Sequence, residues 1–165
     1  MEGNTSVATC REALASILAT EVAQLTELAS LLDREHERLV ANDIEGLEGV
    51  MAQRQEAVGQ LLTAEEERRN LCRMHGRGID AAGVMQLMTW CDPHGTLKAC
   101  WEACAKGASR CRELNDRNGA LVNARMKRVE TLLTALTGQP REAPTYGPKG
   151  AYAPTRSGRV LATEA

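Results

Sequence analysis

The sequence predicts an all-α protein, an elongated antiparallel helical bundle or coiled coil of three long helices and one short helix. Three observations predict this fold class. The 165-residue chain has no proline before Pro93, and proline disrupts helix interiors because it lacks an N–H donor and clashes with the preceding turn. Aromatic residues make up only 2% of the chain, and phenylalanine is absent, whereas compact β and α/β cores usually rely on large rings. Ala, Leu and Val beside abundant Glu and Arg are typical of long helices.

An apolar stripe between residues 14 and 39 predicts the first long helix. Its steps of three, four and seven residues place the stripe on one helical face. Asn4, Thr5 or Ser6 can cap the start of this helix, and Asn42 and Asp43 interrupt the pattern at its end. The stripe consists of Leu14, Leu18, Val22, Leu25, Leu28, Leu32 and Leu39.

A second stripe predicts a second long helix, which Asn42 or Asp43 can cap and which Gly76 and Gly78 end. Because the joint between the two helices is short, we expect them to form an antiparallel hairpin. The second stripe, expected to pack against the first, consists of Ile44, Leu47, Met51, Val58 and Leu61, with Leu62 alongside.

A short helix and a third long helix follow. Asp80 can cap the short helix, and Pro93 and Gly95 close it. The long helix is expected from Thr96 to Gly138. The dipeptide Asn118-Gly119 signals a β-hairpin turn when the residues on both sides alternate between apolar and polar, as in strands. Here the residues on both sides instead keep the apolar spacing of a helix. We therefore place Gly119 inside the helix, at a cost of about 1 kcal/mol, where it can permit close helix packing.

Residues 139–165 are expected to be a flexible tail following a helical domain at residues 1–138. The tail holds four prolines and three glycines, and its four basic and two acidic residues give it a net charge of +2. Such a segment buries too little apolar surface to offset its ordering entropy.

The formal net charge of −2 does not suggest a nucleic-acid partner. The N-terminus lacks the pattern of a signal peptide, and no apolar run approaches the roughly 20 residues needed to cross a bilayer. We therefore expect a cytoplasmic protein without membrane insertion, in which the six cysteines are reduced.

Cys91, His94, Cys100 and Cys104 form the sharpest hint of metal chemistry, because zinc prefers such ligands. Their spacing matches no paired zinc knuckle, however, and Cys104 falls on the apolar stripe, where a free cysteine acts as a small hydrophobe. Core packing is thus the favoured interpretation. No catalytic constellation or phosphate-binding loop is present, so we predict neither enzymatic activity nor a cofactor.

The last long helix carries apolar residues along two adjacent lines of its surface. A bundle of three long, thin helices cannot cover all of them. A groove exposed there would accept an amphipathic helix from a partner protein. The candidate contacts are Leu121, Val122, Met126, Val129, Leu133 and Leu136.

The sequence also resembles the FlgN family of flagellar export chaperones. The resemblance rests on Arg112-Glu113-Leu114-Asn115, on Asn118-Gly119-Ala120-Leu121 and on Tyr146-Gly147-Pro148-Lys149-Gly150. Trp101 also stands where the family often has tryptophan. A weaker similarity to the family's N-terminal hairpin extends the match to about residues 14–159.

The resemblance implies an all-α cytosolic chaperone without catalytic activity. It implies binding of the C-terminal amphipathic helices of hook-associated proteins, the hook–filament junction proteins, and their delivery to the flagellar type III export gate. On this interpretation the last helix supplies the groove and Tyr146 contacts the gate, whereas Asn115, Asn118 and Gly119 shape the helix. The alternative is a generic helical scaffold or dimerisation module, with or without zinc at the cysteine cluster.

Overall fold

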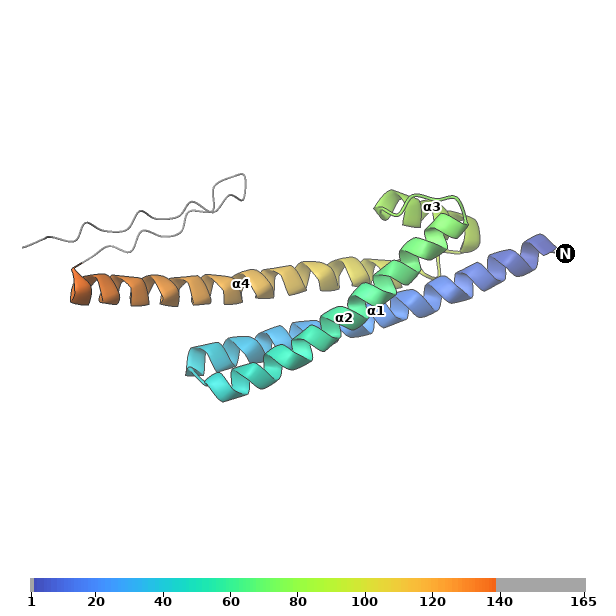
Figure 1. Ribbon diagram of the computed structural model, residues 1–165. Helices are drawn as coiled ribbons and strands as arrows, with labels where there is room; N and C mark the ends of the chain where they lie inside the picture. Colours follow the sequence, from blue (N-terminus) through green and yellow to red (C-terminus); the bar gives the residue numbers. More distant parts are fainter. Residues whose placement is uncertain (1, 139–165) are drawn as a thin grey trace, which may run out of the picture. The chain divides into compact units, whose positions relative to one another are not determined.

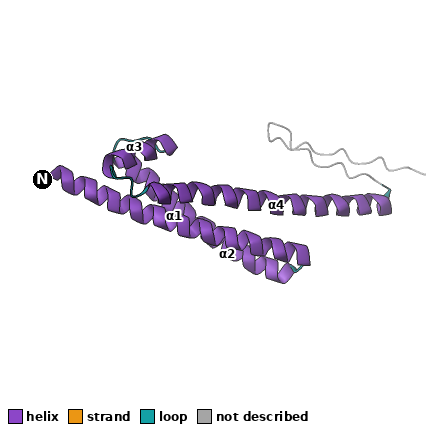
Figure 2. Ribbon diagram, turned by 180° about the vertical axis from the view of Figure 1, so that it is seen from behind, coloured by secondary structure: helices purple, strands orange, loops and turns teal. Residues whose placement is uncertain are grey.

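The computed structural model describes residues 2–138, with side chains from Ser6 onward, and this part of the chain contains helices and no strand (Figures 1 and 2). The all-α prediction is confirmed. No helix in the described range is long and apolar enough to span a membrane. The helices are α1 (Glu2–Ala41), α2 (Ile44–Met74), α3 (Ala81–Cys91) and α4 (Lys98–Thr137).

Tertiary contacts divide the chain into two units, residues 1–125 and residues 126–165. The first unit contains α1, α2, α3 and most of α4. The described part of the second unit consists of the last turns of α4 and ends at Gly138.

Two of the helix starts follow from aspartate caps, as the sequence predicts. The Asp43 carboxylate accepts a hydrogen bond from the Gly46 N–H at 2.9 Å, and Asp80 accepts one from the Gly83 N–H at 2.8 Å. Both bonds satisfy N–H groups that have no partner within the helix. The cap predicted at Asn4–Ser6 is wrong, because α1 already begins at Glu2.

Glycines end the helices where the sequence places them. Gly76 adopts φ +64°, and the N–H of the following Arg77 donates to the Cys72 carbonyl at 2.9 Å. This left-handed turn satisfies a terminal carbonyl of α2 and favours glycine, which has no Cβ to clash. Gly95 and Gly138 also adopt positive φ, after α3 and α4 respectively.

Helices α1 and α2 form the predicted antiparallel hairpin. Arg54 of α2 pairs with Glu35 of α1 at 3.0 Å, and Arg68, further along α2, pairs with Glu21, which lies earlier in α1, at 2.9 Å. Since later residues of one helix meet earlier residues of the other, the two helices run in opposite directions.

The hydrophobic core of the first unit is built largely on α1. All of the predicted leucines of its stripe are buried, and Val22 is partly buried. Helix α3 covers one end of the hairpin with Val84, Leu87, Met88 and Cys91. From α4 the core receives Cys104, Cys111 and Leu114.

The packing face predicted for α2 is wrong for its most exposed members, whereas Val58 and Leu61 do pack against the core. Ile44, Met51 and Leu62 are between 51% and 62% exposed, whereas Leu47, Val58 and Leu61 are partly buried. The residues that α2 buries are mainly small, namely Val50, Ala57, Ala64 and Cys72. Small side chains let two helices approach closely, so the hairpin uses the line of α2 beside the one with the largest apolar groups.

Candidate functional site

The first part of α4 lies on α1 in a parallel arrangement with a constant register. Cys104 Sγ donates to the Leu18 carbonyl at 3.6 Å, and Cys111 Sγ donates to the Leu25 carbonyl at 3.3 Å. One heptad later, Asn118 Nδ2 donates to the Leu32 carbonyl at 2.8 Å. Each of these pairs is separated by 86 residues in sequence. We call this line of contacts the α1–α4 seam.

A glycine allows close approach at the seam, but it is Gly107 and not Gly119. A Cβ built at Gly107 would lie 3.1 Å from Leu25 Cβ, tighter than ordinary van der Waals contact. Gly119 is exposed, and a Cβ there would meet nothing within 4 Å. The close packing expected at Gly119 is therefore wrong, although α4 does continue through it.

Asn118 and Asn115 join a polar network that links α1, α2 and α4. Asn118 is only 4% exposed, and it also donates to Glu35 Oε2 at 3.1 Å. Its Oδ1 lies 3.0 Å from His36 Nδ1. Arg54, which pairs with Glu35, donates to Asn115 Oδ1 at 2.8 Å. A buried polar group needs its partners, so this network favours one register of α4 on the hairpin.

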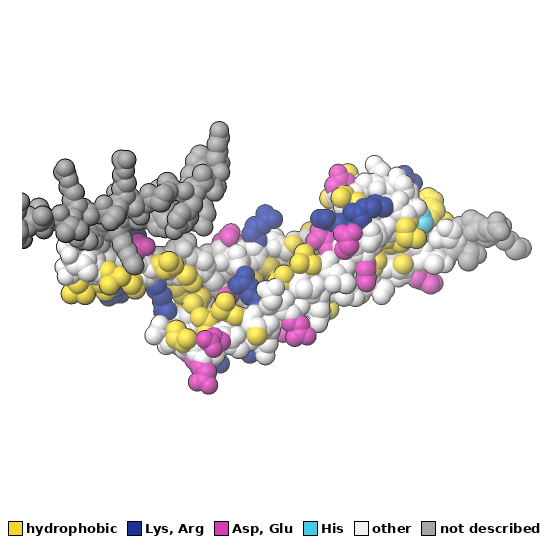
Figure 3. Space-filling view, in the orientation of Figure 1, with side chains coloured by type: hydrophobic (Ala, Val, Ile, Leu, Met, Phe, Trp, Pro, Cys, Tyr) yellow, Lys and Arg dark blue, Asp and Glu magenta, His cyan; other side chains and the backbone are white. Residues whose placement is uncertain are grey.

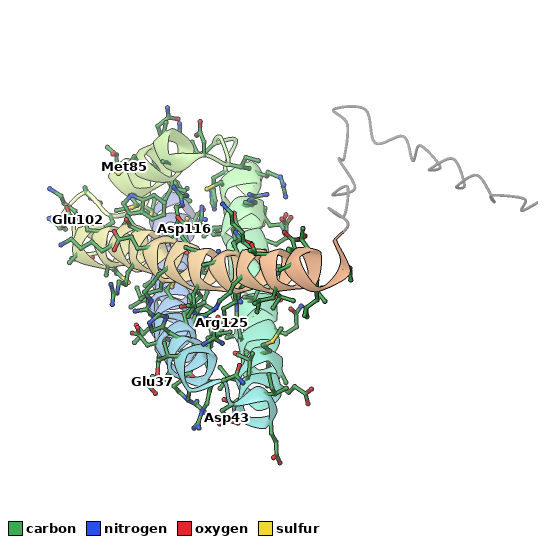
Figure 4. All side chains as sticks on the ribbon, turned by 90° about the vertical axis from the view of Figure 1, so that its left-hand side faces the viewer. Glu37, Asp43, Met85, Glu102, Asp116 and Arg125 are labelled. Carbon is green, nitrogen blue, oxygen red and sulfur yellow. The ribbon has the colours of Figure 1, made fainter. Side chains whose placement is uncertain are left out.

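The seam ends near the hairpin turn with Arg125. Its guanidinium extends from α4 toward the end of α1 and lies 3.4 Å from both the Val40 carbonyl and Asn42 Oδ1 (Figure 4). Arginine at the end of a helix interacts favourably with the last, unpaired carbonyls. This contact lies at the C-terminal limit of the first unit.

Trp101 lies at a hollow of about 280 Å³ within the first unit. Its ring is partly buried, and the Arg68 guanidinium lies 5.5 Å from the ring centroid. Arg68 in turn donates to the buried carboxylate of Glu21 at 2.9 Å. Trp101 thus helps to cover a desolvated ion pair, while Leu114 is fully within the core.

The residues predicted to form the partner groove lie on α4, and most are exposed. Leu121 is partly buried, and the exposed fractions of the others range from 38% for Val122 to 83% for Leu136. Leu121 and Val122 belong to the first unit, and the groove residues from Met126 onward belong to the second. Within the second unit, the spacing of three and four residues puts Met126, Val129, Leu133 and Leu136 on one face of the helix. The exposed members are Val122, Met126, Val129, Leu133 and Leu136.

Leu132 is an exposed apolar residue of this face that sequence reasoning missed. It lies three residues after Val129, which is the spacing that could have identified it. Tyr146 and Gly147, the predicted gate contact and its neighbour, lie outside the described residues.

The structure does not gather the cysteine cluster into a metal site. Cys91 and Cys104 are buried, Cys100 is partly buried and His94 is exposed. Among the described residues, no group of three or more His, Cys, Asp or Glu side chains is placed to hold a metal ion. Burial raises the pKa of Cys104 to about 12, and burial likewise raises the pKa of Cys91. Both thiols are therefore protonated and uncharged at neutral pH, as expected for cysteines that pack in the core.

Comparison with protein families identifies the chain. The family model described as FlgN protein matches residues 10–154. The chain belongs to the FlgN family. Comparisons with curated proteins and with solved structures gave no significant match. Membership of the FlgN family, a family of chaperones, supports a general role as a flagellar export chaperone. The FlgN match includes the seam, the polar network and the exposed face of α4.

Proposed function

We propose that this protein is a cytosolic flagellar type III export chaperone for the hook–filament junction proteins. It binds their C-terminal amphipathic helices, prevents premature assembly and delivers them to the export gate. The observation that carries this proposal is the exposed apolar face of α4, formed by Val122, Met126, Val129, Leu132, Leu133 and Leu136.

The apolar face of α4 suits an amphipathic helix because its anchors recur every three or four residues along one face. Fully burying one such side chain contributes about 1.5–3 kcal/mol, and the anchors are already partly covered, so each contributes less. Ordering a cargo helix costs about 2–5 kcal/mol. We therefore expect a dissociation constant near or modestly below about 1 μM, weak enough for release at the gate.

Titration calorimetry with the C-terminal segment of a junction protein from the same organism tests the proposal. We expect saturable one-to-one binding with a negative heat-capacity change, because apolar surface is buried. Val129→Asp should weaken binding by more than about tenfold, since it places a charge among the anchors. Thr131→Asp is the matched control, because Thr131 is exposed on the opposite side of the same helix.

Two results would count against the proposal. Absence of binding at high micromolar concentrations would remove the assigned cargo. Equal affinity of the helical Val129→Asp and Thr131→Asp variants would move the cargo site away from this face of α4.

Delivery is assigned to Tyr146, which the family resemblance singles out. An aromatic anchor in the segment after the helical domain can be captured by a pocket of the gate while the domain holds cargo. Binding of cargo and delivery of cargo are then carried by different residues, and substitutions can separate them.

A further inference from the structure

The outward surface of α2 carries an apolar stripe that the fold leaves largely uncovered, although Val58 within it also packs against the core. Its largest members are Ile44, Met51 and Leu62, each more than half exposed. Leu47 and Val58 lie between them and are partly buried. Steps of three, four and seven residues place all five on one line of the helix, called the α2 stripe below.

The α2 stripe lies beside the line that packs on α1. Met51 and Val58 directly follow the buried Val50 and Ala57, and one residue corresponds to about 100° around a helix. The hairpin therefore closes mainly on the small residues and leaves Ile44, Met51 and Leu62 outside. Figure 3 shows hydrophobic side chains on the surface around the hairpin end of the first unit. An apolar patch of several large side chains on a protein surface commonly marks an interaction site.

Acidic residues border the α2 stripe on its open side. Glu45 and Glu48 directly follow Ile44 and Leu47, which turns them a further 100° or so away from α1. Both are exposed, and neither forms an ion pair with any described residue.

The acidic character continues along α2. From Ile44 to Glu67 this helix holds six glutamates and a single basic residue, Arg54. Arg54 is occupied by Glu35 and Asn115 in the polar network. Glu65 and Glu66, beyond the end of the stripe, pair with Arg69 and Arg73. The unpaired negative charge of the border therefore lies mainly at its first turns, at Glu45 and Glu48.

We infer that the α2 stripe is a second docking surface, and that its occupant is an amphipathic helix of a partner protein with basic residues beside its apolar face. The apolar line supplies anchors at helical spacing, and the acidic border selects the charge of the partner by complementarity. A second copy of this chain is disfavoured as the occupant, because two acidic borders would then face each other. This inference does not rest on cargo binding by α4.

The length of the stripe sets the size of the partner helix. From Ile44 to Leu62 the stripe extends about 27 Å at 1.5 Å per residue, so a helix of about 20 residues covers it. Two synthetic peptides of that length test the inference. Both carry the same leucine face, and they differ only in having lysine or glutamate at the positions that flank it.

We expect the lysine-flanked peptide to bind the full-length protein one-to-one in fluorescence anisotropy, at least tenfold more tightly than the glutamate-flanked peptide. Met51→Lys should weaken this binding at least tenfold, whereas Gln60→Lys, an exposed change on the opposite side of α2, should not. The double variant Glu45→Lys with Glu48→Lys should reverse the preference between the peptides.

The inference is overturned if the lysine-flanked peptide does not bind, if both peptides bind equally, or if Met51→Lys and Gln60→Lys behave alike. A dimer in sedimentation equilibrium that Met51→Lys dissociates would overturn it in favour of a second copy. The Val129→Asp variant should bind the lysine-flanked peptide normally. If Val129→Asp abolished binding of the lysine-flanked peptide, the peptide would bind on α4 and the inference would be overturned. Loss of junction-protein binding in the same variant would bear only on the proposed function.

Discussion

Asn118→Ala should destabilise the protein far more than Asn115→Ala, although the two asparagines lie one helical turn apart. Asn118 is buried and donates both to the Leu32 carbonyl and to the Glu35 carboxylate. Asn115 is exposed and accepts one hydrogen bond, from Arg54. The pair thus compares a buried and an exposed member of the same network.

The magnitude follows from the bonds that each substitution removes. A hydrogen bond to a charged group contributes about 1.5–3 kcal/mol, and one between neutral groups contributes about 1 kcal/mol. Asn118→Ala removes one of each from the amide nitrogen and also the contact of its Oδ1 with His36, so the free energy of unfolding should fall by at least about 3 kcal/mol. Asn115→Ala should lower it by less than about 1 kcal/mol, although its partner Arg54 is charged, because water can replace this exposed bond and Arg54 keeps its bond to Glu35.

Urea denaturation followed by far-ultraviolet circular dichroism measures both values. The dependence of the unfolding free energy on urea concentration should be the same in each variant as in the wild type, which checks that the transition stays two-state. The reasoning is refuted if the two variants lose equal stability, or if Asn118→Ala loses less than about 1 kcal/mol. Either outcome would mean that the buried network contributes little to holding α4 on the hairpin.

Three further predictions use the same structure. Gly119→Ala should raise the free energy of unfolding by about 1 kcal/mol through helix propensity, whereas Gly107→Leu should lower it by about 1–3 kcal/mol by crowding Leu25, both measured by urea denaturation. Burial alone would raise the pKa of Asp92, but hydrogen bonds from the Leu97 N–H and Thr96 hold that pKa below its usual 3.8. Its ionised form therefore stabilises the fold above that value and loses this effect as pH falls through the lowered pKa, so the stability difference between wild type and Asp92→Ala should shrink in strongly acidic buffer. Tyr146→Ala should leave calorimetric cargo affinity unchanged while reducing secretion of the junction proteins; reduced cargo affinity would instead assign Tyr146 to the cargo site.

Helix boundaries were predictable because local residues set them. Asp43, Asp80, Gly76 and Gly138 act through their own backbone geometry and nearby N–H or carbonyl groups. The start of α1 was missed because Asn4, a residue type that favours caps, lies inside the helix. A capping residue permits a helix start but does not require one.

The face that each helix buries was harder to predict. Periodicity identifies an apolar line, but on α2 the neighbouring line of Val50, Ala57 and Ala64 packs on α1. Small side chains allow two helix backbones to pack closely, and the hydrophobicity of a residue does not indicate whether it permits such packing. As a result, Met51 and Ile44 were assigned to the core although they are exposed.

The candidate site was predictable only in part. The helical spacing from Val122 to Leu136 identified the apolar face of α4, but its binding role stays a prediction. The register of the seam depends on contacts across 86 residues, between Asn118 and Leu32 for example, which no local pattern encodes. Tyr146 was identified from family resemblance alone.

The long sequence separation across the α1–α4 seam has a consequence for the order of folding. Hairpin pairs such as Arg54 and Glu35 are 19 residues apart, whereas Cys104 and Leu18 are 86 residues apart. Loop-closure entropy makes the longer connection about 1.3 kcal/mol more costly to form, so the hairpin should form first. During synthesis α4 also leaves the ribosome last. The α1 face around Leu18 and Leu25 therefore stays uncovered until α4 arrives, and a nascent chaperone of this kind passes through a stage in which its own apolar helices are unprotected.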